Sequence, residues 1–135
     1  LKVHDPSLPV LATHTGVDGV LPHWRNLDDD QLRAVADSGG GIGVIFHVGF
    51  LCRSGGPTDG QMVLEHMEHI IEITGEDHVA IGSDYDGAIT PPDGLRSEPA
   101  YARLVQWMLE RGWTESRIEK ALGGNFLRCF EALRP

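Results

Sequence analysis

The sequence predicts an α/β fold made of three parallel βα units followed by further helices. Short apolar runs alternate with amphipathic helical patterns along the chain, which is the order expected of parallel βα units. The apolar runs show almost no alternation of polar and apolar residues. Continuous apolar strands are typical of a parallel sheet that is covered on both faces.

Composition agrees with a folded domain, since 41% of the 135 residues are hydrophobic and 23% are charged. The formal net charge is −9, which argues against nucleic acid or an anionic membrane as a partner, because both need clustered Lys and Arg.

No apolar run approaches the roughly 20 residues of a transmembrane helix. We therefore expect a soluble chain, cytoplasmic or periplasmic if its source is bacterial. The two cysteines, Cys52 and Cys129, are expected to be free thiols.

The first βα unit covers the segment up to the glycines at 39–41. Residues 9–13 form an apolar run that leads to His14 and is typical of a buried strand. A loop follows, and Asp28 is a suitable N-cap for a helix at 28–37. The glycines end that helix. They are not expected to bind phosphate, because phosphate loops run from a strand into a helix.

The second unit contains a strand at 42–48, a loop at 53–60 and a helix at 61–74 that ends at Gly75. The helix has apolar residues at helical spacing. It also carries four potential metal ligands, namely Glu65, His66, Glu68 and His69. Because the apolar residues must face the core, we expect the solvent side to carry most of Glu65, Glu68, His69 and Glu72.

The third unit begins with a strand at 78–83 that runs into Asp84, followed by a loop rich in glycine and proline. Ser97 is a suitable cap for a helix that extends to Arg111.

Two shorter helical patterns close the chain. Thr114 is a suitable cap for the first, and Gly123-Gly124 is expected to break it before a last amphipathic helix that starts at Asn125.

Three βα units do not close a barrel, and a complete (β/α)8 barrel takes about 250 residues. We therefore expect residues 1–135 to form a single partial domain, the C-terminal part of a TIM-like barrel. Leu1 is not a usual initiator, so we also expect the chain to start at a cut or processed position. A small independent open sheet is the alternative.

In parallel α/β folds, working groups gather at the C-terminal ends of the strands. Three polar residues are predicted to lie there. His14 is a candidate metal ligand or a hydrogen-bonded structural histidine. Asp84 is a candidate metal ligand or general base, or the cap of a turn. Only its position favours a functional role for His47, and a pore-lining or packing role is the preferred interpretation.

Arg25 lies in the loop after the first strand. A guanidinium group binds a carboxylate through two parallel hydrogen bonds, which makes Arg25 a candidate substrate-binding residue. An ion pair with the acidic run 28–30 is the alternative.

Several stretches, in this order, resemble the zinc dipeptidases of the membrane (renal) dipeptidase family and their bacterial relatives. They cover nearly the whole chain. The matching stretches are Pro-Val-Leu-Ala-Thr-His-Thr (9–15), His-Trp-Arg-Asn-Leu-Asp-Asp-Asp-Gln-Leu-Arg (23–33), Gly-Gly-Gly-Ile-Gly-Val (39–44), His-Ile-Ile-Glu-Ile-Thr-Gly-Glu-Asp-His-Val-Ala-Ile-Gly-Ser-Asp-Tyr-Asp-Gly (69–87) and Leu-Gly-Gly-Asn-Phe-Leu-Arg-Cys-Phe-Glu (122–131).

The resemblance implies a distorted (β/α)8 barrel with two zinc ions that hydrolyses dipeptides. His14 matches a zinc-ligand histidine. Arg25 matches the arginine that binds the C-terminal carboxylate of the substrate. Asp84 matches the last-strand aspartate beside the metals, near the attacking water and the amino end of the substrate.

The other ligands of the family belong to earlier strands, outside these 135 residues. The resemblance therefore implies that this chain needs the remainder of the barrel as a partner, that it is inactive alone, and that a homodimer is possible. Two alternatives stay open. One is another barrel metallohydrolase that acts on a non-dipeptide amide, and the other is a metal-free, inert fragment or binding relative.

Overall fold

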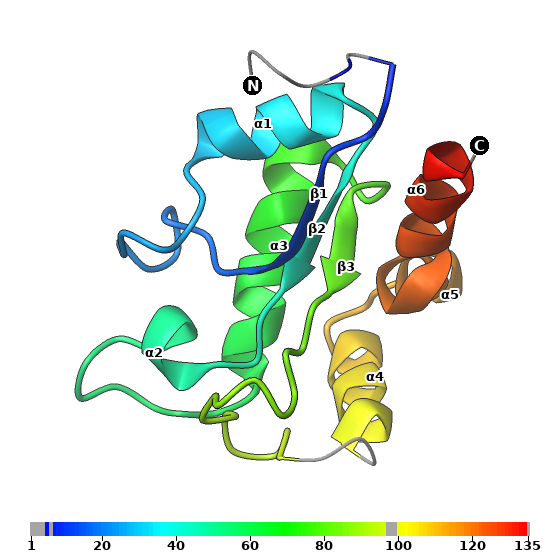
Figure 1. Cartoon of the computed structure of the whole chain (residues 1–135). Coiled ribbons are helices and arrows are strands. Elements are labelled where there is room, and N and C mark those ends of the chain that lie inside the picture. The colour runs from blue at the N-terminus through cyan, green and yellow to red at the C-terminus, as the bar shows by residue number, and fades with distance from the viewer. Residues whose placement is uncertain (1–4, 6, 97–99, 135) are drawn as a thin grey trace.

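One three-stranded parallel sheet forms the centre of the computed structural model, which describes residues 5, 7–96 and 100–134 (Figure 1). The strands are β1 (Leu11–Thr15), β2 (Gly41–Val44) and β3 (Val79–Ile81), in the order β1-β2-β3. Both strand pairs are parallel. All four residues of the central strand β2 are buried. The predicted α/β fold with a parallel sheet is therefore confirmed.

The helices α1 (Asp29–Asp37) and α3 (Gln61–Thr74) connect the strands, and they contact each other and β2 (Figure 1). Asp28 is the N-cap of α1, as predicted, and forms a capping box with Gln31. Helix α3 spans the predicted residues and ends at Gly75, whose φ of 87° lies in the region that favours glycine.

The C-terminal part consists of α4 (Tyr101–Glu110), α5 (Glu115–Glu119), a wide helical turn η2 (Lys120–Gly124) and α6 (Asn125–Leu133). Thr114 caps α5, as predicted. The expected break at Gly123-Gly124 is a kink at Gly123 that separates two helices. The predicted cap Ser97 lies outside the described residues, and α4 begins after Ala100.

The strand boundaries differ from the prediction. Strand β2 ends at Val44 rather than at 48, and a short helix, α2 (Val48–Leu51), follows. The backbone bonding continues past Val44, because the N–H groups of Ile45 and Phe46 donate to the carbonyls of Thr15 and Ser83, and the N–H of Val48 then donates to the carbonyl of Thr90, in the loop after β3. Strand β3 is likewise shorter than the predicted 78–83, and β1 continues through His14 to Thr15.

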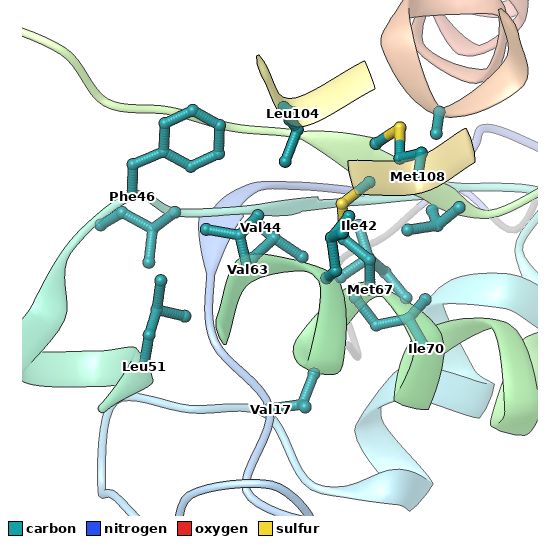
Figure 2. Packing of buried hydrophobic residues seen from close by; sticks show 14 of the residues in the cluster. Val17, Ile42, Val44, Phe46, Leu51, Val63, Met67, Ile70, Leu104 and Met108 are labelled. Atoms are coloured by element: carbon teal, nitrogen blue, oxygen red, sulfur yellow. The ribbon is translucent and has the colours of Figure 1, made fainter. Parts of the chain in front are cut away.

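The core lies where α3 and α4 meet the sheet. Figure 2 shows Val63, Met67 and Ile70 of α3 and Leu104 and Met108 of α4 gathered around Ile42 and Val44 of β2. These seven side chains are all completely buried. Burial of this kind stabilises a fold by about 1.5–3 kcal/mol for each large apolar side chain.

The polar side chains of α3 differ in part from the expectation that they lie on the solvent side. Glu65 is exposed, but Glu68 and His69 are only partly exposed and have partners on other helices. Glu68 accepts a hydrogen bond from Arg111 at 2.7 Å. The Nε2 atom of His69 lies 2.7 Å from the Asp29 carboxylate of α1. Glu68 and His69 thus connect α3 to the end of α4 and to α1, while Glu65 faces water.

Helix α6 packs against the amino ends of the strands. The Asn125 amide donates to the carbonyls of Glu76 and Val79 at 2.9 and 2.8 Å. The Arg128 guanidinium donates to the carbonyls of Gly39 and Asp77. The amino end of the sheet is thus covered, and the carboxyl end is left for the candidate site. In the described part of the chain, no helix has the length and apolar character needed to cross a membrane.

Candidate functional site

His14 lies next to last in β1 and is half-buried. Its Nδ1 atom lies 2.9 Å from the hydroxyl of Thr13. The segment directly after β3 approaches the backbone of His14 closely, because Gly82 has no side chain and a Cβ there would lie 3.0 Å from the His14 Cα. The position at the carboxyl end of the sheet agrees with the prediction.

Arg25 lies in the loop between β1 and α1 and contacts His14. Its Nη2 atom donates to the carbonyl of His14 at 3.4 Å, and its backbone N–H donates to Nδ1 of His23 at 3.1 Å. The guanidinium carbon lies 5.9 Å from the centre of the Phe50 ring, a distance at which a cation is attracted to an aromatic face.

The alternative ion pair of Arg25 is not formed among the described residues. Asp29 interacts with His69 instead, and Asp30 pairs with Arg33 at 3.0 Å. The guanidinium of Arg25 therefore keeps hydrogen-bonding capacity for a ligand, since only one of its five N–H donors has a described partner.

Asn26 holds this loop against α2. Its amide nitrogen donates to the carbonyls of Leu21 and Phe50, both at 2.9 Å. The residue is 8% exposed, and a side chain at Gly16 would overlap it. Phe50 also contacts His23, with ring centres 5.0 Å apart. Sequence reasoning missed Asn26 and Phe50, because no local pattern links a loop amide to an aromatic residue 24 positions later.

Asp84 begins a turn after β3, in which the N–H of Gly87 donates to the Asp84 carbonyl at 3.0 Å. Its carboxylate lies over Gly87, where a Cβ would overlap it. Asp84, Asp86 and Ala88 all have φ near 60°, a conformation that is uncommon outside glycine and that often occurs at functional sites. Asp84 makes no hydrogen bond to His14 or Arg25 among the described residues.

The described residues contain no group of three or more His, Cys, Asp or Glu side chains that could hold a metal ion. A zinc site takes about four ligands, counting water. His14 fits the role of one ligand, because an imidazole at a strand end is a common zinc ligand. The remaining ligands of a metal centre would have to come from outside the described residues.

The fold and the site together define an α/β protein with polar groups at the carboxyl ends of parallel strands, the arrangement on which barrel enzymes build their active sites. Comparison with known families identifies the family. The chain belongs to the membrane dipeptidase family, peptidase family M19, whose model matches residues 4–134.

Several relatives support this membership. The chain is 41% identical over 132 residues to the Klebsiella pneumoniae protein named "Uncharacterized protein in pqqA 5'region". It is 34% identical, with a TM-score of 0.86, to a metallo peptidase from Rhodobacter sphaeroides whose crystal structure contains a phosphinate mimic of the dipeptide L-Ala-D-Ala. An amidohydrolase from Pseudomonas aeruginosa is 27% identical, with a TM-score of 0.82.

The alignments cover most of this chain but less of each relative. They include 95% of this chain and 48% of the Klebsiella protein. For the Rhodobacter and Pseudomonas structures, they include 93% of this chain and 36% and 46% of the other chain, respectively. The chain thus spans about half the length of the curated relative, or less for the solved structures.

Proposed function

We propose that residues 1–135 form a single partial domain, the C-terminal part of a (β/α)8 barrel that hydrolyses dipeptides with the help of metal ions. The share of each relative that the chain covers supports this proposal. So does the sheet, in which β1 and β3 each pair on one side only among the described residues. A parallel sheet buried on both faces needs further strands or helices to cover such edges.

The proposal that the substrate is a dipeptide depends mainly on Arg25. Its guanidinium lies at the carboxyl end of the sheet, bonded to the backbone of the candidate metal ligand His14. There it would bind the C-terminal carboxylate of a dipeptide through two parallel hydrogen bonds. The dipeptide mimic bound to the 34% identical Rhodobacter metallo peptidase supports this substrate class.

Asp84 is assigned to the other end of the substrate. A carboxylate at this position would bind the dipeptide's amino group or accept a proton from the attacking water. Recognition of a carboxylate at one end and an amine at the other would make the site select for dipeptide length, because longer peptides cannot satisfy both contacts.

His14 is assigned as one ligand of a zinc centre with two ions, whose other ligands come from the remainder of the barrel. When bound, such metal ions supply positive charge that polarises a carbonyl group and makes a nearby water more acidic. The contribution of this chain is to hold His14, Arg25 and Asp84 at the same end of the sheet.

The test is the Arg25→Ala substitution in the full-length protein, loaded with zinc and with its intact mass checked. Loss of a charge-assisted hydrogen bond should raise KM for dipeptides by about 10- to 100-fold, since such bonds contribute about 1.5–3 kcal/mol. Arg33→Ala is the matched control, because Arg33 lies on α1 and pairs only with Asp30 among the described residues. An unchanged KM in Arg25→Ala would contradict carboxylate recognition.

A second candidate is hydrolysis of an amide that is not a dipeptide. The 27% identity to the amidohydrolase from Pseudomonas aeruginosa supports this second candidate. The two candidates differ in the role of Arg25, since an amide without a free carboxylate gains nothing from a guanidinium group. A full-length protein that binds about two zinc ions, cleaves such amides and leaves dipeptides intact would support this second function. A full-length protein that binds no metal would support a binding role instead.

A further inference from the structure

We propose that His47 is a positioning residue that holds the guanidinium of Arg25 ready for the substrate carboxylate, acting through Phe50. This inference rests on the proposed dipeptide-binding role of Arg25. Three observations carry it: the packing of His47 on Phe50, the anchoring of His47 by another loop, and the contacts of Phe50 with the Arg25 loop.

The His47 ring lies against Phe50. The ring centres are 4.6 Å apart and the planes are at 77°, an edge-to-face arrangement that is favourable for aromatic pairs. The ring also lies beside Gly49, where a Cβ would come within 2.9 Å of Nε2. The chain therefore leaves room for His47 to fold back over its own short helix α2 and reach Phe50.

A second loop holds the His47 ring in this orientation. The backbone N–H of Thr90 donates to its Nδ1 atom at 2.9 Å, and the N–H of Val48 donates back to the Thr90 carbonyl at 3.0 Å. Two further backbone bonds, from Asp93 to Thr58 and from Gly60 to Asp93, join the same loops farther out. The loop that follows Asp84 is thereby connected to α2, which contains Phe50, and to the loop after α2.

Phe50 connects the fixed position of the His47 ring to Arg25. Its ring lies 5.9 Å from the guanidinium carbon and 5.0 Å from the His23 ring. Its carbonyl accepts a hydrogen bond from Asn26, the neighbour of Arg25. Loss of the His47 ring would free Phe50 to rotate, and the guanidinium would lose the aromatic face on which it rests.

We expect substitution of His47 to weaken substrate binding rather than to slow the chemical step. His47 touches neither His14 nor Asp84 in the described structure, so it should alter the position of Arg25 without changing the reacting groups. In the full-length zinc enzyme, His47→Ala should raise KM for a dipeptide about fivefold, the scale of a partly exposed cation–π contact. The value of kcat should stay within about twofold.

A double-mutant cycle separates positioning from a general loss of stability. If His47 acts through Arg25, His47→Ala should add almost nothing to the KM of Arg25→Ala, because the contact it supports is already gone. His78→Ala is the control. His78 is half-buried like His47, and its ring also bonds to a backbone group, the carbonyl of Gly40 at 2.8 Å. It lies just before β3, at the amino end of the sheet and away from the candidate site.

Two milder variants keep the test decisive if His47→Ala unfolds. His47→Phe keeps an aromatic ring beside Phe50 and should recover most of the wild-type KM. His47→Asn keeps an acceptor for Thr90 but no ring, and should not. Recovery by Asn alone, equal effects of His47→Ala and His78→Ala, or additive effects of His47→Ala and Arg25→Ala would each overturn the inference. A wild-type enzyme that cleaves no dipeptide would instead overturn the proposed function, and this inference with it.

Discussion

His66 on α3 is completely buried, and its ring connects two separate segments of the chain. Its Nδ1 atom accepts a hydrogen bond from the N–H of Val17 at 2.9 Å, so the proton must be on Nε2, which lies 3.2 Å from the Leu51 carbonyl. The bond from Val17 requires a neutral ring, since a protonated Nδ1 cannot accept it. Burial, the largest cause, lowers the pKa of His66 from 6.5 to about 4.

This histidine predicts a loss of stability in mild acid. Between pH 6.5 and 4 the unfolded chain binds a proton at His66 and the folded chain does not, so the free energy of unfolding falls as pH falls. The contribution is fully present above pH 6.5 and should decrease by about 2 kcal/mol at pH 5.

Denaturant unfolding of the full-length protein at pH 8 and pH 5 measures this effect. His66→Gln should reduce the difference between the two pH values, although it lowers stability at both. Val63→Ala, a buried substitution on the same helix without an ionisable group, should keep the wild-type difference. Equal pH dependence in wild type and His66→Gln would assign the acid sensitivity to other groups.

For Asp84 we predict an effect on activity rather than on stability. Asp84→Asn keeps the size of the side chain and removes its charge, so kcat on dipeptides should fall by about 10²- to 10⁴-fold, the range of general acid–base catalysis. Asp86→Asn is the control, because Asp86 lies in the same loop with a φ of 66° and is exposed. Similar activities of the two variants would remove Asp84 from the catalytic groups.

At the scale of elements, the start of α1 depends on a reciprocal pair of hydrogen bonds. The Asp28 carboxylate accepts from the N–H of Gln31 at 2.8 Å, and the Gln31 side chain accepts from the N–H of Asp28 at 3.0 Å. These bonds satisfy two backbone donors that the helix itself leaves unpaired. The N-cap also fixes where the loop that carries Arg25 ends.

Asp28→Ala should therefore destabilise the protein by about 1 kcal/mol. Asp30→Ala is the matched control, because Asp30 lies in the same first turn and its side chain is 97% exposed in its pair with Arg33; such pairs contribute little. Thermal unfolding of the two variants checks the difference. If both variants unfolded at the same temperature, net charge rather than the cap would explain the effect of Asp28.

The helices were predicted more accurately than the strands. The bounds of α3 and the caps of α1 and α5 agree with the sequence, because caps and helical periodicity are local signals. The end of β2 is not a local property. Ile45 and Phe46 are buried, and their N–H groups still donate to the carbonyls of Thr15 and Ser83. Thr15 is the last residue of β1 and Ser83 lies beyond the end of β3, so the regular pairing that defines β2 ends at Val44.

At the scale of the molecule, two glycines allow the sheet to curve. A Cβ at Gly43, in β2, or at Gly82, directly after β3, would overlap the carbonyl oxygen of Thr13. The carboxyl ends of all three strands therefore come close together, as the candidate site requires.

Gly82→Ala should destabilise the full-length protein by about 1–3 kcal/mol, the usual cost of overpacking. It should also lower activity, because the backbone of His14 must shift. Gly124→Ala is the milder control, because its Cβ would meet the Glu119 carbonyl oxygen at 3.3 Å, a tight contact but not an overlap; it should destabilise the protein less than Gly82→Ala and keep its activity. A fully active, stable Gly82→Ala would show that the strands tolerate a wider separation.

Residue types and their spacing along the chain were enough to predict the alternation of strands and helices, most helix ends, the resemblance to the family, and the candidates His14, Arg25 and Asp84. The pairs of side chains that meet could be found only in the folded structure, where Arg25 contacts the backbone of His14, Asn26 contacts Phe50, and His47 contacts Thr90. The physical reason is that these contacts join different elements, and their partners are selected by the closure of loops and the packing of the core rather than by any local pattern.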